Sequence, residues 1–245
     1  MKGVLLFGGT GSRLYPLTKT VNKHLLPVGQ KPMGQWGIEK LVSAGITEIL
    51  IITGIEQCGS VISQFGDGSD YGCNLTYKVQ VKAGGIAQAL ALAEHFVGGD
   101  SCCVILGDNI FNKDLTPIVK NFRSGATILL KEVKDPQRFG VAETIEKMSM
   151  YGDQVQVLNI EEKPKKPKSN KAVTGIYFYD NTVFDKIRTI KPSARNELEI
   201  TDVNNTYINE NNMTAYIMKE EEFWSDAGTF DSLYRANRLV RKMED

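Results

Sequence analysis

Histidine is scarce in this sequence, and its cysteines lack the spacing of a metal site. His24 and His95 are the only histidines, and the 4 cysteines form no C-x-x-C pair, so the patterns of zinc and iron–sulfur sites are missing. The adjacent Cys102 and Cys103 lie in the apolar run CCVIL, where buried thiols are the simpler interpretation. These features favour a reduced protein, and we expect it in the cytoplasm.

The sequence also lacks long apolar runs and an excess of charge. No apolar segment approaches the roughly 20 residues that a membrane-spanning helix needs. The apolar stretch within the first segment, MKGVLLFGG, is too short for a signal peptide. Lys plus Arg number 29 and Asp plus Glu number 29, which argues against a general electrostatic hold on nucleic acid. We therefore expect no membrane and no nucleic-acid partner, and favour a small bound anion.

The first half contains short runs rich in valine, isoleucine and leucine. KGVLLF, EILIIT and CCVIL are typical of strands buried on both faces of a parallel sheet. The helix-like stretches PMGQWGIEKLVSAG and GIAQALALAEHFVGG separate them, and each ends at glycine. The alternation predicts an α/β fold with a Rossmann-like, doubly wound sheet and helices on both faces.

The second half has a different pattern. ATILLKEV, FGVAET, VQVLNIEEKP and VTGIYFYD follow one another with little helix between them, which predicts antiparallel additions to a mixed sheet. A final helix, TFDSLYRANRLVRKM, is expected to pack on the body through Phe230, Leu233, Tyr234 and Leu239. We predict a single domain over residues 1–245, with the lysine-rich KPKKPKSNK as an exposed loop or else a boundary.

A glycine-rich turn follows the first strand. In LFGGTGSRLYPLT, Gly9 and Gly11 begin like a dinucleotide fingerprint, but Leu14 stands where the third glycine is needed, and no Walker motif is completed. Glycines let the backbone approach a ligand, successive amides form an anion-binding concavity, and the guanidinium of Arg13 matches a phosphate. The segment is therefore a phosphate-binding loop or only a tight exit from the strand.

The following motifs occur in the order of a known family. They are NKHLLPVGQKPM, LGDN, EEKP, VTGIYFYD, SARNELEITD and WSDAGT. The chain resembles the glucose-1-phosphate thymidylyltransferase family of sugar nucleotidyltransferases, which carries K-Q-L-L-P, K-P-M, L-G-D-N, E-E-K-P, V-T-G-[LI]-Y-F-Y-D, S-A-R-G-E-L-E-I-T-D and W-x-D-T-G. Each motif alone is weak, but their order is specific, and the resemblance covers nearly the whole chain.

The resemblance implies a magnesium-dependent reaction. A phosphate oxygen of α-D-glucose 1-phosphate would attack the α-phosphorus of dTTP, giving dTDP-glucose and pyrophosphate. Such a reaction depends on positioning and charge neutralisation, and the anionic attacking oxygen needs no general base. The resemblance further implies a nucleotide-binding part at about residues 1–110, a sugar-binding and assembly part at about 111–245, a homotetramer, and a place in rhamnose or other deoxysugar synthesis.

The resemblance also assigns roles to individual residues. The catalytic residues would be Arg13 on the departing pyrophosphate, Lys23 at the reacting phosphates, and Lys163 holding the sugar phosphate. The nucleotide-binding residues would be Leu6, Gly8, Gly9, Gly11, His24, Gln80, Gly85, Ile86 and Asp108. The sugar-binding residues would be Asn109, Gly140, Glu162, Lys163, Val173, Thr174, Glu197 and Trp224.

Asp108 and Asp226 would be the magnesium ligands. Mg²⁺ prefers a few carboxylates together with waters and phosphate oxygens, so two converging aspartates suit it. Taken by residue type alone, Asp108 also suits a turn at a strand end, Asp226 a position near a helix N-terminus, and Lys163 a solvated loop. Asp108 follows the strand CCVIL, and ligands gather at the carboxyl ends of parallel strands.

Several residues depart from the family pattern. Phe7 replaces a small residue, and we expect its ring beside the nucleotide loop. His24 replaces glutamine, Gly34 a more typical residue, and Asn196 a glycine. Two alternatives stay open, namely the same reaction with UTP or another hexose 1-phosphate, and a non-catalytic protein that binds nucleotide sugars.

Overall fold

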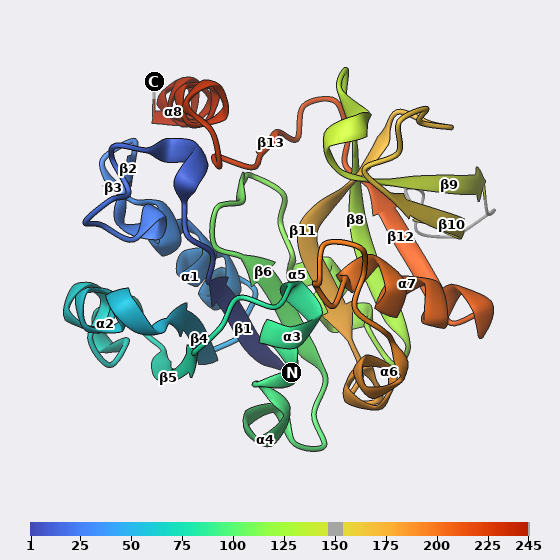
Figure 1. Cartoon of the computed structure of the whole chain (residues 1–245), viewed down its shortest axis with the longest axis horizontal. Helices are drawn as coiled ribbons and strands as arrows, with labels where there is room; N and C mark the ends of the chain where they lie inside the picture. The colour runs from blue at the N-terminus through green and yellow to red at the C-terminus, as the bar shows by residue number, and fades with distance from the viewer. Residues whose placement is uncertain (147–153, 245) are drawn as a thin grey trace.

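The fold is built around one large mixed sheet. The structure, a computed structural model, describes residues 1–146 and 154–244. The strand order of the nine-stranded sheet is β5-β4-β1-β6-β11-β8-β12-β10-β9, with β4 and β5 at one end of the molecule and β9 and β10 at the other (Figure 1). Its strands are β1 (Lys2–Phe7), β4 (Glu48–Gly54), β5 (Asn74–Gln80), β6 (Cys102–Leu106), β8 (Ala126–Glu132), β9 (Gly140–Glu146), β10 (Gln154–Glu162), β11 (Lys171–Tyr179) and β12 (Met213–Ile217).

The first half of the chain forms the parallel part of this sheet. β1 lies between β4 and β6, and β5 pairs with β4, all in parallel register. Val4 and Leu6 join one apolar core, whereas Leu5 and Phe7 join the core on the opposite face. Successive side chains of a strand point to opposite faces, so an uninterrupted apolar run is buried on both. The expectation from KGVLLF, EILIIT and CCVIL is confirmed.

The second half extends the same sheet with mixed pairings. β11 is antiparallel to both β6 and β8, β12 is parallel to β8, and β10 is antiparallel to β12 and β9. The mixed α/β fold predicted from the sequence is thus confirmed. Residues 163–170, the lysine-rich segment, connect β10 to β11 as a loop. The division of the chain into two functional parts near residue 110 stays a prediction.

Helices cover both faces of the sheet, as predicted. Residues of α1, α2 and α5 pack in the core with Leu5 and Phe7, and residues of α3, α4, α6 and α7 in the core with Val4 and Leu6. The helices are α1 (Met33–Ser43), α2 (Cys58–Phe65), α3 (Ile86–Ala91), α4 (Glu94–Val97), α5 (Thr116–Asn121), α6 (Val183–Thr189), α7 (Ile200–Asn209) and α8 (Phe230–Glu244). The predicted helix GIAQALALAEHFVGG is two helices, because Leu92 and Ala93 form a tighter turn in which each amide bonds to the carbonyl three residues back.

The last helix packs through only part of the stripe expected, because Leu233 is partly buried against the core that contains Ala236 and Val240. Phe230 and Tyr234 are 47% and 67% exposed, whereas Ala236 and Val240 are buried with Trp36 of α1. Residues four apart lie on one face of a helix, and Ala236 and Val240 define the buried face. α8 lies beside the two-stranded pair β2 (Pro27–Val28) and β3 (Lys31–Pro32) (Figure 1).

Cys102 and Cys103 lie next to each other in β6. Cys102 and Cys103 are fully buried, and burial raises the pKa of Cys102 to about 12. All four cysteines are free thiols. Among the described residues, no helix is both long and apolar enough to cross a membrane.

Candidate active site

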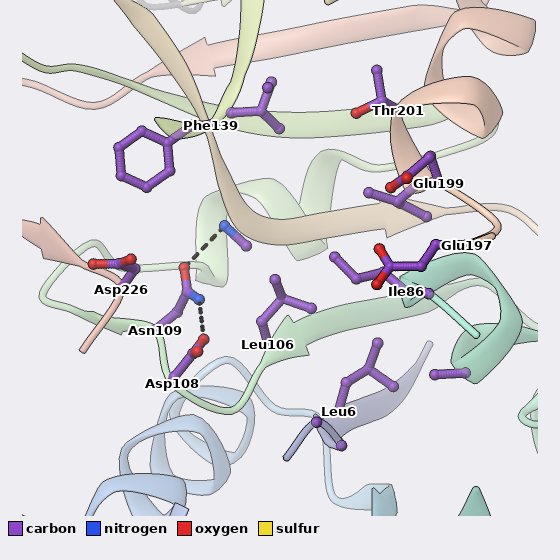
Figure 2. Close-up of a pocket in the computed structure, with 18 of the residues that line it drawn as sticks. Leu6, Ile86, Leu106, Asp108, Asn109, Phe139, Glu197, Glu199, Thr201 and Asp226 are labelled. Atoms are coloured by element: carbon purple, nitrogen blue, oxygen red, sulfur yellow. Dashed lines mark hydrogen bonds between the residues drawn. The ribbon is translucent and has the colours of Figure 1, made fainter. Parts of the chain in front are cut away.

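A pocket of about 400 Å³ opens where β1, β5 and β6 end at their carboxyl termini. Leu6, the last residue but one of β1, and Leu106, the last residue of β6, form part of its wall, and Figure 2 shows them below Glu197 and Glu199 of the opposite side. Ligands bind at this edge in open α/β sheets. The pocket is lined by 18 of the 20 residues predicted as site residues, namely Leu6, Gly8, Gly9, Arg13, Lys23, His24, Gln80, Gly85, Ile86, Asp108, Asn109, Gly140, Glu162, Lys163, Val173, Glu197, Trp224 and Asp226.

The glycine-rich turn after β1, which contains Gly8, Gly9 and Gly11, lies against Gln80 at the end of β5. A Cβ atom at Gly8 would come 2.6 Å from Oε1 of Gln80, so a side chain there would displace the glutamine. Gly9 has a φ of 93°, a conformation that favours glycine. Gly11, by contrast, lies outside the pocket lining, and its carbonyl accepts a hydrogen bond from Oγ1 of Thr18 at 2.7 Å. Gly11 shapes the turn with a φ of 64°, which favours glycine, and its role at the nucleotide phosphates stays a prediction.

Two cations and a carboxylate meet beneath this loop. Nζ of Lys23 lies 2.5 Å from Oδ2 of Asp108. A Cβ atom at Gly228 would lie 3.0 Å from Nη2 of Arg13 and 3.3 Å from Oδ2 of Asp108, so the loop after β13 (Trp224–Ser225) fits closely over both. Burial is the largest influence on the pKa of Asp108 and would raise it, but the charge of Lys23, the hydrogen bond from Lys23 and the other positive charges nearby together hold this pKa below its ordinary value. Asp108 is therefore an ionised acceptor at neutral pH.

A short strand pair brings the second aspartate to the same place. β7 (Ile110–Phe111) directly follows Asn109, and Ser225 of β13 pairs with Ile110 in antiparallel register. Continuing that register places Asp226 opposite Asn109, where Figure 2 shows it. Oδ1 of Asn109 accepts hydrogen bonds from the Gly175 amide at 2.9 Å and from Nε1 of Trp224 at 2.6 Å.

The same asparagine also binds Asp108. Its Nδ2 donates to Oδ1 of Asp108 at 3.0 Å, as the dashed line in Figure 2 shows. An amide oxygen has two lone pairs and an amide nitrogen two protons. Because Asn109 commits both lone pairs and one proton within the protein, one N–H is left to donate to a ligand.

Carboxylates and further cations line the opposite wall. Oε2 of Glu162 accepts a hydrogen bond from Oγ1 of Thr201 at 2.8 Å. Arg195 donates to Glu199 through Nε at 3.2 Å and through Nη2 at 2.8 Å. Asn196, at the position where the family has glycine, has a φ of 58°, which asparagine tolerates better than most residues.

Two expectations from the sequence are wrong. The Thr174 side chain is fully buried on the other face of β11, where Oγ1 donates to the Leu129 carbonyl at 2.9 Å, so this hydroxyl does not bind the sugar. Its neighbours Val173 and Gly175 line the pocket, as the alternation of a strand requires. The Phe7 ring lies in the core on the face away from Leu6 and stacks on the His24 ring at 4.7 Å, so it does not flank the nucleotide loop.

Residues 2–243 match the family model described as nucleotidyl transferase. The chain belongs to this family. A glucose-1-phosphate thymidylyltransferase of Neisseria meningitidis is 43% identical over 249 residues, which cover 100% of this chain and 84% of that protein. A glucose-1-phosphate thymidylyltransferase of Mycolicibacterium smegmatis is 42% identical over 247 residues, covering 100% of this chain and 83% of that protein.

Solved structures give the same family. A Bacillus anthracis protein, provisionally named a glucose-1-phosphate thymidylyltransferase and crystallised with a sucrose, has a TM-score of 0.90 and 55% identity over 98% of this chain and 95% of that chain. A UDP-glucose pyrophosphorylase bound to UDP-glucose shares the fold, with a TM-score of 0.87 at 24% identity over 99% and 98% of the two chains. This nucleotidyltransferase is therefore an enzyme of a family that transfers nucleotidyl groups.

Two arginines of this nucleotidyltransferase were missed in the sequence. Arg138 lines the pocket, and its Nη2 lies 3.1 Å from Oδ2 of Asp226. Arg195 lies among Glu162, Glu197 and Glu199 at 3.4, 3.5 and 2.8 Å. Arg138 directly precedes the segment FGVAET, and Arg195 lies inside SARNELEITD, so the positive charge at each of these segments was a usable signal.

Proposed function

We propose that this nucleotidyltransferase transfers a thymidylyl group from dTTP to α-D-glucose 1-phosphate, giving dTDP-glucose and pyrophosphate. One observation carries the proposal: Arg13, Lys23, Asp108, Lys163 and Asp226, which come from motifs spread over the chain, line a single pocket. The names of the relatives supply the substrates, and the charges supply the chemistry. A transfer between two phosphate groups depends on positioning and on neutralising negative charge.

Base recognition is proposed at Gln80. Its Nε2 donates to Oε1 of Gln88 at 2.6 Å, which leaves Oε1 on the side of Gly8 as an acceptor. Thymine and uracil present an imino N–H that such an oxygen can accept, whereas cytosine presents a lone pair at that position. Gln80 would therefore select thymine or uracil against cytosine and leave the choice between dTTP and UTP to other contacts.

The base and sugar sides of the pocket are connected through Leu198. The Ala87 amide donates a hydrogen bond to the Leu198 carbonyl at 3.1 Å, and the Leu198 amide donates one to the Gly84 carbonyl at 2.8 Å. A Cβ atom at Gly85 would come 2.4 Å from the Leu198 carbonyl oxygen. Gly85 and Ile86 are thus held directly beside Glu197 and Glu199, which supports a joint site for base and hexose.

The sugar phosphate is proposed to bind at Lys163. This residue follows Glu162 at the end of β10, lines the pocket, and has a half-exposed side chain whose Nζ lies 3.6 Å from Oε1 of Glu162. Gly140 lies next to the same glutamate, because a Cβ atom there would be 3.4 Å from Oε2 of Glu162. The ammonium of Lys163 would draw the sugar phosphate toward the α-phosphate, while Glu162 accepts hydroxyls of the hexose.

Magnesium is proposed as the cofactor, held by Asp108 and Asp226. The residues fit this ion, since both carboxylates line one pocket and Asp226 lies opposite the residue that follows Asp108. Among residues 1–146 and 154–244, no three or more histidine, cysteine, aspartate or glutamate residues gather as an all-protein metal site. Mg²⁺ keeps waters and phosphate oxygens in its shell, so two carboxylates suffice. When bound, it would neutralise the charge of the triphosphate.

The proposal is tested by pyrophosphate release across a matrix of substrates. Purified protein would be incubated with dTTP, UTP, CTP or ATP, each combined with several hexose 1-phosphates, with and without Mg²⁺. We expect release from dTTP only when a hexose 1-phosphate and Mg²⁺ are both present, and none from CTP. Faster release with UTP would reassign the nucleotide. Nucleotide binding without turnover in every combination would favour a non-catalytic binder of nucleotide sugars.

The family resemblance also supports a homotetramer in the cytoplasm that supplies rhamnose or another deoxysugar. Sedimentation velocity of the purified protein tests the oligomeric state.

A further inference from the structure

Both aspartates proposed as metal ligands are paired with cations. Lys23 pairs with Asp108 at 2.5 Å, and Arg138 pairs with Asp226 at 3.1 Å. Lys23 already has a role at the reacting phosphates. Arg138 has none, although it touches a carboxylate on which the proposed chemistry depends.

Arg138 is anchored where the chain enters the sugar-binding strand. It ends a short 3₁₀ turn (Pro136–Arg138) directly before Phe139 and Gly140. Its Nη1 lies 2.8 Å from Oδ2 of Asp135, and its Nη2 reaches Asp226. Its guanidinium also lies over the Phe139 ring at 5.1 Å. Two separate nitrogens therefore hold two separate carboxylates.

This division matters because the two contacts can be broken independently. The bond from Nη1 to Asp135 stays within one turn of the chain, whereas the bond from Nη2 to Asp226 joins segments 88 residues apart. A divalent cation approaching Asp226 meets an oxygen already occupied by a donor and a positive charge beside it. Like charges close together disfavour binding, and negative phosphates brought by a nucleotide would offset that effect.

We propose that Arg138 is a positioning residue that occupies Asp226 in the substrate-free enzyme and yields this carboxylate when the nucleotide arrives with its metal. The inference rests on the proposed function for the identity of the metal ligands. Its consequence is that the free enzyme binds divalent cations weakly and avoids loading the site without a triphosphate. Asp135 keeps the guanidinium nearby throughout, so only Nη2 has to move.

The test is the affinity of the substrate-free enzyme for Mn²⁺, a spectroscopic substitute for Mg²⁺, measured by electron paramagnetic resonance. Arg138→Gln removes the charge and should bind Mn²⁺ at least fivefold more tightly than the wild type. Arg188→Gln is the matched control, because Arg188 also bridges two carboxylates, Glu94 and Asp185, one of them three residues back. Its Mn²⁺ affinity should equal that of the wild type.

A second set of variants assigns the effect to Asp226. The tighter Mn²⁺ binding of Arg138→Gln should vanish in the Arg138→Gln/Asp226→Asn double variant. Arg138→Lys keeps a positive charge, so its Mn²⁺ affinity should stay within twofold of the wild type. Arg138→Met replaces Arg138→Gln if thermal unfolding shows that the latter does not fold. Unchanged or weaker Mn²⁺ binding after loss of the charge would overturn the proposal. No nucleotide or sugar phosphate is present, so this outcome is independent of the substrate assay above.

Discussion

At the scale of single residues, Lys163 is a loop lysine that lines the pocket. Its φ is 46°, unusual for a residue other than glycine, and its amide donates to the Phe139 carbonyl at 3.0 Å. Such a conformation persists only where the surrounding structure holds it, and it is common at functional sites. The half-exposed ammonium lies at the pocket although the loop around it is solvated.

Lys163→Ala should weaken the use of sugar phosphate far more than the binding of dTTP. A charge-assisted hydrogen bond contributes about 1.5–3 kcal/mol, so the KM for glucose 1-phosphate should rise by roughly tenfold or more. Lys168→Ala is the control from the same loop, where the lysine pairs with Glu143 at 3.0 Å. Steady-state kinetics decide the point, and equal kinetics of the two variants would return Lys163 to the solvated loop.

His24 gives the folded state a dependence on pH. The ring is buried, and its Nδ1 lies 2.7 Å from Oδ1 of Asn22. Burial first, and then the charge of Lys23, hold the pKa of His24 well below its ordinary value. The folded protein keeps this imidazole neutral, while the unfolded chain takes up a proton near pH 6.5. The resulting stability is complete above about pH 6.5 and is lost as the pH falls.

The contribution of His24 is measured by comparison with His24→Gln, which does not titrate. Between about pH 6.5 and pH 5, the unfolding free energy of the wild type should fall more steeply than that of the variant, by up to about 1.4 kcal/mol per pH unit. Thermal unfolding in a chelator, which removes metal effects at Asp108, gives both curves. Parallel curves over this range would show that His24 titrates alike in both states.

At the scale of elements, Phe7 joins β1 to α1. A Cβ atom at Gly34, in the first turn of α1, would come 2.5 Å from the Phe7 ring, and one at Gly107 would come 2.4 Å from it. With His24 stacked on the same ring, three departures from the family pattern form one packing unit. The bulk of Phe7 is accommodated by the missing side chain of Gly34.

This packing predicts a change of sign. Gly34→Ala should destabilise the wild type by about 1–3 kcal/mol through overpacking, although alanine favours a helix. In the Phe7→Ala background the same substitution should stabilise the protein, because the ring is gone. Gly59→Ala in α2, where a Cβ atom meets nothing within 4 Å, is the control and should have one sign in both backgrounds. Denaturant unfolding of the two backgrounds and of each glycine variant in both, six proteins in all, measures it, and equal effects of Gly34→Ala in both backgrounds would refute the coupling.

At the scale of the whole molecule, the sequence predicts what is local and misses what depends on direction or distance. Strand and helix types followed from apolar runs and terminal glycines, and most of the residues predicted from motifs line one pocket. An apolar run does not reveal which face each residue takes, so the directions of Phe7 and Thr174 were misjudged. The pair of Arg138 with Asp226 spans 88 residues and has no local signal.

The central claim is that remote motifs build one reaction centre, and the two aspartates test it most directly. Turnover would be measured against Mg²⁺ concentration for Asp108→Asn, Asp226→Asn and the double variant, with nucleotide binding as a check on folding. Each single change removes a carboxylate charge from the shell of the Mg²⁺ that would neutralise the phosphoryl oxygens, so we predict a loss of roughly a hundredfold or more. Residues serving one ion act as a unit, so the double variant should be scarcely worse than the worse single one. Losses that multiply, or a single variant with wild-type metal dependence, would contradict a shared ion.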